Sequence, residues 1–409
     1  MPELELRPVG AADFPAYLAT LRAAFHSSVM EDEAELEQAV FEPARSLAAF
    51  DGGAMVATAG VYSREITVPG GPVPVAAVTF VGVRPTHRRR GLLNRMMRRQ
   101  LADVHAAGRE AIAALWASEG RIYWRFGYAV ASRAAELRVH AGGARLRTDP
   151  PLPPATDPGG DREPLAAVYE AVRPERPGLL DRTAPWWDLR LHDPERNRAR
   201  PPGAGPLTVA VQPDEDGAPA GYALYAVRTA WRQGRPDGEV LVRELVARTP
   251  EAHAALWRHL LGLDLTSRMT WELAPPDEPL GLMLDDFSAV RAELGTGLWV
   301  RLVDVGRALA ERAYAAPVDV VLEVHDDVCP WNSGRCRLAA DAGGAVCEPT
   351  TAPADLALGV DALGSAHLGG ITLSALAAAG RVEERRRGAL GAAGRAFRGD
   401  AEPWCPEIF

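Results

Sequence analysis

The segment from Ala76 to Ser118 constrains the fold of this chain most strongly. It starts with a β-branched strand, Ala76 to Val83, continues through the basic turn PTHRRRG, and then enters a helix. Apolar residues recur in that helix at helical spacing, whereas arginines take the opposite face. A second apolar strand, AIAALWAS, follows at Ala111 to Ser118. This order predicts a βαβ unit with a basic turn at the start of its helix.

The basic turn predicts an anion site. A glycine at a helix start lets the main chain approach a ligand closely, and the first N–H groups of a helix have no partner within it. Arg88, Arg89 and Gly91 precede Leu92 and Leu93 in this position, and the three arginines of the turn add positive charge for a phosphate. A solvated basic helix start is the alternative, but its charge would oppose the helix dipole unless an anion were bound. We therefore expect a cofactor pyrophosphate along this turn.

Two proline-rich stretches divide the chain. Thr148 to Pro164 cannot continue as helix or strand, and a weaker break follows at Ala274 to Pro279. After that break, the apolar alternation of Leu298 to Val305 indicates a new domain. A chain of 409 residues is also long enough for two or three domains. We predict three domains, at residues 1–150, 151–288 and 289–409.

The middle segment repeats the strand, turn and helix order more faintly. Glu239 to Ala247 is a predicted strand, Pro250 to Leu263 a helix with Thr249 as its N-cap, and Met269 to Leu273 another strand. The linking turn, RTPEAH, contains no glycine and no cluster of arginines. We expect this segment to keep the fold of the first and to lack its phosphate site.

Composition narrows the class of partner. The net charge is −9, and all 45 basic residues are arginines because the chain has no lysine. An acidic chain is a poor candidate for nucleic-acid binding and suits a cationic small molecule better. No signal peptide precedes the first domain and no apolar run reaches the ~18 residues of a membrane span, so we expect a cytoplasmic protein without a membrane partner.

The cysteines do not point to a metal. They lack a CxxC pair, and reduced, partly buried thiols are the simpler interpretation in a cytoplasm. All four lie in the last fifth of the chain: Cys329, Cys336, Cys347 and Cys405. We therefore expect no metal cofactor.

Two stretches carry a resemblance to a known family. VTFVGVRPTHRRRGLLNRMM, from Val78 to Met97, and ASEGRIYWRFGYAVAS, from Ala117 to Ser132, resemble the Eis (enhanced intracellular survival) branch of the GNAT acetyltransferases. Leu93 stands where most GNAT proteins have glycine or alanine, but leucine is normal in this branch. The resemblance implies an α/β (α+β) chain with an active GNAT domain, a degenerate GNAT domain and a sterol-carrier-like domain. It also implies acetyl-CoA as co-substrate and a homohexamer.

The same resemblance implies roles for individual residues. The strand at Val81 and Val83 would present its backbone to the pantetheine arm and the thioester oxygen. Tyr128 matches the family's catalytic acid, whereas Tyr123 is interpreted as packing or pocket wall. The α-carboxylate of Phe409, the last residue, would be the catalytic base. Trp404 is expected to help dock the apolar tail that carries it.

The implied reaction is direct transfer of an acetyl group, in a ternary complex, to an amine of a cationic substrate. Aminoglycosides, protein lysines, polyamines and arylalkylamines all fit. The acidic run from Glu31 to Glu37 could attract such a substrate, although a solvated helix face is the favoured interpretation. Two alternatives stay open, namely an acyl-CoA-binding protein without transferase activity and a lipid carrier.

Overall fold

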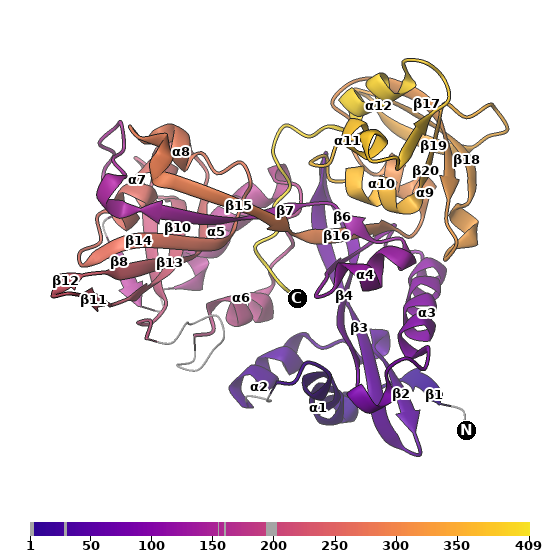
Figure 1. Ribbon diagram of the computed structural model, residues 1–409, viewed down its shortest axis with the longest axis horizontal. Helices are drawn as coiled ribbons and strands as arrows, with labels where there is room; N and C mark the ends of the chain where they lie inside the picture. The colour runs from indigo at the N-terminus through magenta and orange to yellow at the C-terminus, as the bar shows by residue number, and fades with distance from the viewer. Residues whose placement is uncertain (1–3, 28–30, 154, 159–160, 194–202) are drawn as a thin grey trace. The chain divides into compact units, whose positions relative to one another are not determined.

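Three large β-sheets organise the computed structural model, which describes residues 4–27, 31–153, 155–158, 161–193 and 203–409 (Figure 1). The chain divides into two units. The first contains Met1–Ser132, Leu298–Asp400 and Glu407–Phe409, and the second contains Arg133–Gly297 and Ala401–Pro406. None of the described helices is long and apolar enough to cross a bilayer.

The first unit contains a seven-stranded sheet in the order β1-β2-β3-β4-β5-β16-β6. Its strands are β1 (Glu5–Pro8), β2 (Leu47–Asp51), β3 (Ala54–Val68), β4 (Gly71–Val83), β5 (Ile112–Trp116), β6 (Ala129–Val130) and β16 (Leu298–Leu302). Its helices are α1 (Phe14–Ala24), α2 (Glu31–Val40), α3 (Leu92–Ala107) and α4 (Gly120–Tyr123). The predicted βαβ unit is confirmed, since β4 and β5 are parallel and α3 connects them.

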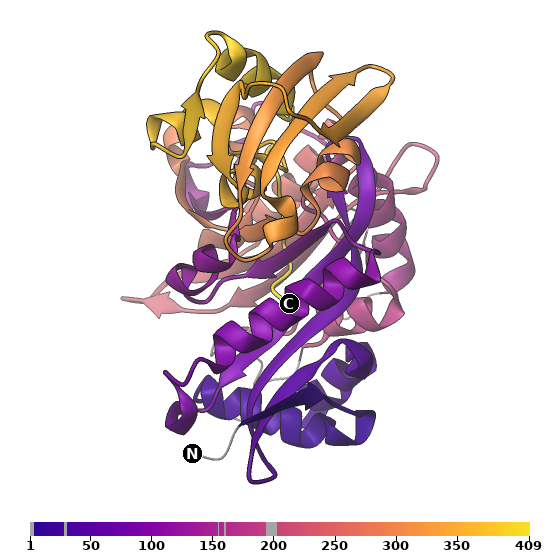
Figure 2. The same cartoon turned by 90° about the vertical axis from the view of Figure 1, so that its right-hand side faces the viewer.

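Local sequence explains most of this arrangement. Gly52 and Gly53 both have positive φ, 55° and 86°, and they form the turn between β2 and β3. Helix α3 buries its apolar face, including Met96, Met97 and Leu101, and runs alongside β3 and β4 (Figures 1 and 2). The buried face is the one that the helical spacing predicts.

Strand β16 belongs to the first sheet, which corrects the expectation that Leu298 to Val305 opens the third domain. Its residues pair with β5, as in Val300 with Ala114, and with β6, as in Trp299 with Val130. Every residue of the strand is buried. Apart from Arg301 the strand is apolar on both faces, so its own sequence does not reveal which sheet it joins.

The second unit contains another seven-stranded sheet, in the order β15-β7-β14-β13-β10-β9-β8. Its strands are β7 (Arg133–His140), β8 (Ala155–Pro158), β9 (Thr208–Pro213), β10 (Pro219–Arg228), β13 (Gly238–Ala247), β14 (Thr266–Ala274) and β15 (Val290–Thr296). A short ribbon adds β11 (Trp231–Arg232) and β12 (Arg235–Pro236), and the helices are α5 (Arg162–Val172), α6 (Ala184–Leu191), α7 (Pro250–Leu261) and α8 (Leu280–Met283). The predicted N-cap of α7 is confirmed, because the Thr249 side chain accepts a hydrogen bond from the N–H of Ala252.

The chain changes sheet at 132/133 and at 297/298, so the predicted boundaries, 150/151 and 288/289, both fall inside the second unit. The reason is the pair β15 and β7 at one end of the second sheet. Only two residues separate the end of β6 from the start of β7, and β15 pairs with β7 along its length. The proline-rich stretch at Thr148 to Pro164 is thus a connection between elements of one unit. Its residues 154, 159 and 160 lie outside the described residues.

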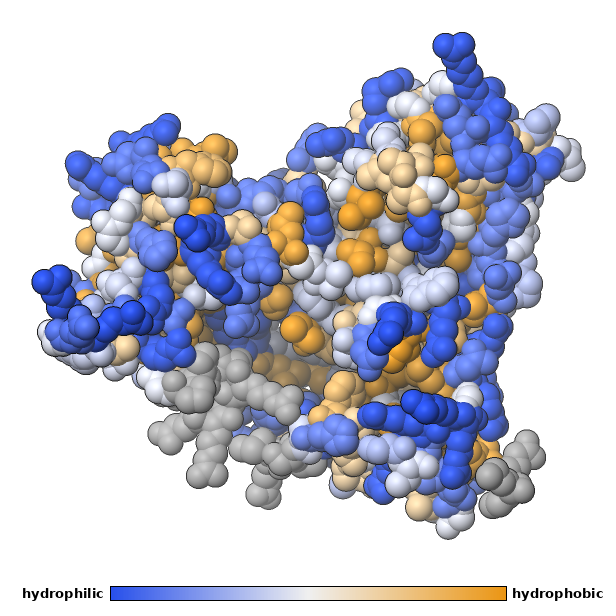
Figure 3. All heavy atoms as spheres, viewed as in Figure 1, coloured by the Kyte–Doolittle hydropathy of each residue, from blue (hydrophilic) through white to orange (hydrophobic). Residues whose placement is uncertain are grey.

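A five-stranded sheet in the first unit completes the fold, in the order β19-β18-β17-β20-β21. Its strands are β17 (Val318–His325), β18 (Gly334–Asp341), β19 (Gly344–Pro349), β20 (Leu356–Gly359) and β21 (Val382–Glu384). The helices of this part are α9 (Val305–Ala310), α10 (Val360–Ala366), α11 (Leu373–Ala378) and α12 (Ala389–Phe397), the last three gathered on one side of the sheet (Figures 1 and 2). The face drawn in Figure 3 is mostly hydrophilic, with small separate apolar patches. The mixed α/β fold class is confirmed.

Candidate active site

The strand β4 carries a bulge next to the basic turn. Thr58 pairs with Gly82 and Gly60 pairs with Thr79, so the register between β3 and β4 shifts at this point. Phe80, within the bulge, has φ +52°, a conformation that non-glycine residues rarely adopt. Its carbonyl accepts a hydrogen bond from Thr58 Oγ1 at 2.7 Å. The bulge leaves Phe80 and Val81 without partners in β3, and the pairing resumes at Gly82 and Val83.

Beyond the bulge, β4 and β5 separate. The two strands pair from Val75 with Ile112 to Ala77 with Ala114, and the pairing ends there although both strands continue. Their far ends therefore have backbone groups that do not bond to each other. Such a gap can receive an extended ligand by β-type hydrogen bonding.

The start of α3 follows this gap in the sequence. Gly91 is the N-cap, with φ +76°, and a Cβ built there would meet nothing within 4 Å. Glycine is therefore favoured by conformation, and the space beside it stays open to a ligand. The first N–H groups of α3, from Leu92 onward, have no acceptor within the helix. This geometry suits an anion, as the sequence predicts.

The arginines of the turn do not act alike. Arg88 Nη2 donates to the carbonyl of Ala24 at 2.9 Å, and its Nε lies 3.5 Å from the carbonyl of Val83, so this guanidinium ties the turn to α1 and β4. Arg90 lies 3.6 Å from Asp51. Arg89 is exposed and has φ +63°. All three residues are exposed, and the expectation that their guanidinium groups serve a phosphate stays a prediction.

These elements surround a cavity of about 730 Å³ in the first unit. All seven residues predicted to bind the cofactor line it: Val81, Val83, Arg88, Arg89, Gly91, Leu92 and Leu93. The remaining wall comes from the end of α1 and from the α4 region, and it includes Ser118, Ile122 and Tyr123. The volume lies in the range of cofactor sites.

Tyr128 lies behind the wall of this cavity. It is fully buried, and its hydroxyl has no hydrogen-bond partner among the described residues. Its ring belongs to the buried cluster against which Val81, Leu93 and Ile122 pack. Burial raises the pKa of Tyr128 well above its usual value, despite the nearby Arg301, so the hydroxyl stays protonated.

The cover over Tyr128 comes from the C-terminal part of the first unit. A Cβ at Gly127, where φ is +80°, would come within 2.9 Å of Val360 Cγ1 in α10. Arg301 of β16 is also adjacent and makes two hydrogen bonds, of 2.9 and 2.8 Å, to Asp326. The tyrosine and glycine could be singled out in the sequence, but the residues that enclose them could not.

Tyr123, expected as packing or pocket wall, lines the cavity directly. Its ring meets that of Tyr128 edge-on, with centroids 6.3 Å apart. Burial raises the pKa of Tyr123 to about 12, and Glu119 adds to this effect. Both tyrosine hydroxyls are therefore protonated at neutral pH.

The C-terminal tail is anchored at Trp404 within the second unit. Its backbone N–H donates to the carbonyl of Pro177 at 2.8 Å, and its indole Nε1 donates to the carbonyl of Leu273 at 2.7 Å. Gly178, with φ +96°, lies so close that a Cβ there would be 2.6 Å from the Trp404 carbonyl oxygen. The predicted docking of Trp404 is confirmed by these contacts.

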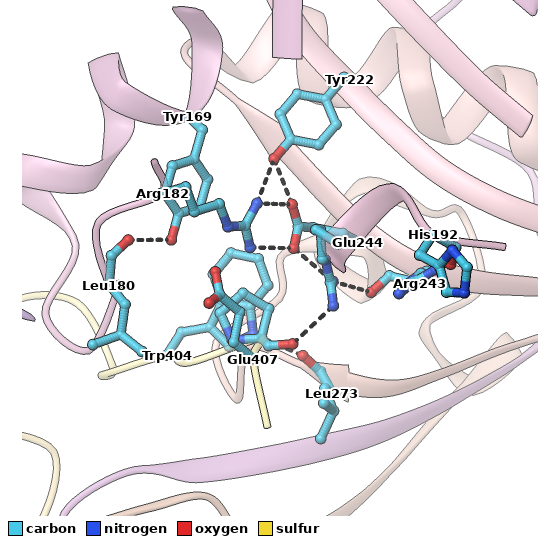
Figure 4. Close-up of polar contacts among 12 residues, drawn as sticks. Tyr169, Leu180, Arg182, His192, Tyr222, Arg243, Glu244, Leu273, Trp404 and Glu407 are labelled. Atoms are coloured by element: carbon cyan, nitrogen blue, oxygen red, sulfur yellow. Dashed lines mark hydrogen bonds and ion pairs between the residues drawn. The ribbon is translucent and has the colours of Figure 1, made fainter. Parts of the chain in front are cut away.

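The second unit also contains a buried charge cluster, which the sequence did not predict (Figure 4). Arg182 and Glu244, both with fully buried side chains, form two parallel hydrogen bonds of 2.8 Å, and Tyr222 donates to the same carboxylate. Arg190 binds Glu244 at 2.6 Å and also donates to the carbonyl of Pro406 at 3.2 Å. Burial alone would raise the pKa of Glu244, but Arg182 and Arg190 outweigh it and lower the pKa to about 2.

The last three residues return to the first unit. Glu407 forms an ion pair with the buried Arg64 of β3, at 3.4 Å. Phe409 is half-buried, whereas Ile408 is 69% exposed. The Ile408 side chain therefore faces solvent and does not help the tail to dock.

The acidic run of α2 is partly structural. Arg22 lies 3.5 Å from Glu33 and 2.7 Å from Glu37, and burial raises the pKa of Glu37 despite that arginine. His87, at the basic turn, lies 3.0 Å from Asp51.

No three His, Cys, Asp or Glu side chains gather into a possible metal site within the described ranges.

Comparison with known proteins agrees with this architecture. Residues 5–131 and 178–302 each match an acetyltransferase (GNAT) domain family, and residues 305–406 match a sterol carrier protein domain. An N-acetyltransferase of Streptomyces avermitilis is 43% identical over 99% of both chains. The N-acetyltransferase Eis of Mycobacterium tuberculosis is 38% identical, over 85% of this chain and 84% of its own. The crystal structure of Eis1 from Mycobacterium abscessus covers 99% of this chain and 100% of its own, with a TM-score of 0.86 and 33% identity.

Two GNAT domains followed by a sterol-carrier-like domain define a GNAT-type N-acetyltransferase, a class whose domains use acetyl-CoA as co-substrate. The identity and coverage of these relatives place the chain more closely. It belongs to the Eis family of N-acetyltransferases.

Proposed function

We propose that this enzyme transfers the acetyl group of acetyl-CoA directly to an amine of a cationic substrate, with both bound at once. The observation that carries the proposal is the cavity in the first unit. It combines an open helix start at Gly91, two separated strands and a buried tyrosine behind its wall. Each feature serves a different part of the same co-substrate.

Acetyl-CoA fits the residues of the cavity. The pyrophosphate would accept hydrogen bonds from the first N–H groups of α3, with Arg89 adding charge at its side. Arg88 would contribute by shaping the turn, since its side chain already binds two carbonyls. The pantetheine arm would lie along Val81 and Val83, where β4 no longer pairs with β5.

The chemistry needs an acid for the departing thiolate. The amine nitrogen forms a bond to the thioester carbon, the C–S bond breaks, and the sulfur takes a proton. Tyr128 is the proposed donor, because its hydroxyl is protonated and has no hydrogen-bond partner among the described residues. A base must also receive a proton from the attacking nitrogen, and for this we propose the α-carboxylate of Phe409.

Contacts of the residues before Phe409 support this assignment. Trp404 and Pro406 are held in the second unit, and Glu407 is held by Arg64 in the first. The carboxylate at a chain end is intrinsically a weak base, with an ordinary pKa of ~3.5 in peptides, so its position must be well defined to be effective. Two carboxylates at the chain end, those of Glu407 and Phe409, would also favour a cationic substrate such as an aminoglycoside, polyamine or lysine side chain.

A cytoplasmic homohexamer belongs to the same proposal and rests on the family resemblance. Light scattering of the untagged protein would measure its mass against 43.8 kDa per chain. A lipid-carrier role is the second candidate, because residues 305–406 match a sterol carrier domain. The buried contacts of this part with Gly127 favour instead a role in covering Tyr128.

The direct test is an acetyl-transfer assay of untagged protein with acetyl-CoA and four amine classes: aminoglycosides, polyamines, arylalkylamines and lysine peptides. Mass spectrometry would count the acetyl groups added. Release of CoA with a matching mass increase in one class supports the proposal. Binding of acetyl-CoA without transfer to any class would instead support the non-catalytic acyl-CoA-binding alternative.

A further inference from the structure

A second cavity lies in the second unit, at the place that corresponds to the cofactor cavity of the first. It occupies about 460 Å³ between the end of β13 and the start of α7, as the first cavity lies between β4 and α3. Strands β13 and β14 pair in parallel up to Val242 and Trp271 and then separate, although both continue. The repeated fold has therefore kept a cleft at this position.

The cleft is not suited to an acyl-CoA. Thr249 caps α7 with its own side chain, and Pro250 at the first helical position has no N–H to offer a phosphate. The indole of Trp404 donates to the carbonyl of Leu273, at the point where β14 has left β13. Two acidic residues, Asp277 and Glu278, also line the cavity and would repel an anion.

Glu278 gives the cavity a specific chemistry. Its side chain is only 2% exposed, and one carboxylate oxygen accepts hydrogen bonds from Trp257 Nε1 at 2.9 Å and from the N–H of Leu280 at 3.1 Å. His253 Nε2 lies 2.8 Å from the same oxygen. The other oxygen, Oε2, has no partner among the described residues. A buried carboxylate oxygen without a donor is costly, and an N–H group of a ligand would remove that cost.

The apolar part of the lining includes Leu245, Val246, Met283 and Trp404. Thr249 and Arg248 line it as well, and the exposed Arg248 donates to the carbonyl of Pro219 at 3.3 Å. Arg176 also lines the cavity, but it is already paired with Asp277. A ligand that matches this lining has a compact apolar body and a positively charged N–H donor.

The cavity is also connected to the C-terminal tail. Trp404 forms part of its wall, and Asp277 accepts a hydrogen bond from the N–H of Glu402 at 3.1 Å. A ligand packed against the Trp404 indole would restrain the segment that leads to Phe409. The connection from Trp404 to Phe409 runs through the covalent chain and needs no other contact.

We propose that this cavity binds a compact organic ammonium ion, with Glu278 as its acceptor, and that occupancy stabilises the C-terminal tail through Trp404. The site is separate from the cofactor cavity, and its occupancy does not depend on the proposed transferase function.

Calorimetric titration of the full-length, untagged protein with 2-phenylethylammonium, in the absence of acetyl-CoA, tests the site. Glu278→Gln keeps the shape and the hydrogen-bonded oxygen but removes the charge, so we expect affinity to fall about ten-fold or more. Its matched control is Glu251→Gln, an exposed carboxylate in the first turn of α7, which should leave affinity unchanged.

A second pair of variants tests the site even if Glu278→Gln fails to fold. Val172→Trp would fill the cavity from its half-buried rim and abolish binding, whereas Ala171→Trp places the same ring on the exposed neighbour and should not. Melting curves of all four variants identify any that fail to fold. If Glu278→Gln is among them, the comparison of Val172→Trp with Ala171→Trp decides whether the cavity binds the ligand.

Hydrogen exchange of the C-terminal peptide tests the connection. Saturating 2-phenylethylammonium should slow exchange at the Glu402 and Trp404 amides at least about two-fold in wild-type protein and not in Val172→Trp. Affinity unaffected by both Glu278→Gln and Val172→Trp, or an unchanged exchange rate in the saturated wild type, would overturn the proposal. None of these measurements requires turnover, so they stand apart from the acetyl-transfer assay.

Discussion

Arg190 donates a hydrogen bond to the carbonyl of Pro406 over 3.2 Å, three residues before the end of the chain. The same guanidinium binds Glu244 at 2.6 Å, and Arg182 donates two hydrogen bonds to that carboxylate (Figure 4). The buried charge cluster of the second unit thus holds the tail at Pro406. Arg190 is a positioning residue in this mechanism.

Arg190→Ala should lower kcat about ten-fold or more, because the tail loses a charge-assisted hydrogen bond near the proposed base. The KM for acetyl-CoA should stay unchanged, since the cofactor cavity lies in the other unit. Arg190→Lys should restore part of kcat, and Arg162→Ala, which removes a surface ion pair with Asp188, is the control. Equal losses in kcat and in acetyl-CoA binding would point to general unfolding instead.

Tyr128→Phe should lower kcat by about 100-fold or more while leaving acetyl-CoA affinity intact, as expected for loss of a general acid. Because the hydroxyl has no partner among the described residues, its removal leaves none of their polar groups unsatisfied, and the melting temperature should not fall. Tyr123→Phe, in the cavity wall, is the matched control and should retain most of kcat. Steady-state kinetics and a melting curve give both values; near-normal turnover of Tyr128→Phe would refute the role of Tyr128.

Blocking the chain end should abolish turnover without unfolding the protein. Deletion of Phe409 moves the carboxylate back by one residue, and a C-terminal amide made by protein ligation removes only its charge. Both should lose activity by about 100-fold or more if the carboxylate is the base. Ile408→Ala is the control, since that side chain is 69% exposed. A fully active amidated enzyme would exclude the α-carboxylate.

Glu244 should make the stability of the second unit depend on acid pH. Its pKa is lowered from 4.5 to about 2 in the folded protein, so the group contributes stability above pH 4.5 and loses it as the pH falls towards about 2. Glu244→Gln should be less stable than wild type at neutral pH, because Arg182 and Arg190 lose their buried counter-charge. Urea unfolding at several pH values should show the two proteins converging below pH 4.5. A constant difference across that range would contradict the assignment.

Much of the first domain could be predicted because its signals are local. The βαβ unit depends on the strand at Ala76 to Val83, a glycine and an amphipathic helix, which follow one another closely in the sequence. All seven predicted cofactor residues line the cavity for the same reason. The N-cap at Thr249 is another local signal, since side chain and amide lie three residues apart.

What failed depended on contacts between distant segments. The second seven-stranded sheet begins at Arg133 because β7 pairs with β14 and β15, more than a hundred residues further along the chain. The contact of Arg88 with the carbonyl of Ala24 is likewise one between distant segments. Neither the partner strands of β7 nor the carbonyl beside Arg88 can be identified from the local sequence.

The sequence by itself determined the elements of the cofactor site, since hydrophobic period, turn glycine and basic residues act within a single strand, turn and helix. Tertiary structure alone decided how Tyr128 is buried, which carbonyls Arg88 contacts, and where the tail is held. Those outcomes depend on segments far apart in the sequence, such as Gly127 with Val360 and Arg190 with Pro406. Packing and paired charges select such contacts only when the whole chain is folded, because neither partner carries a local signal for the other.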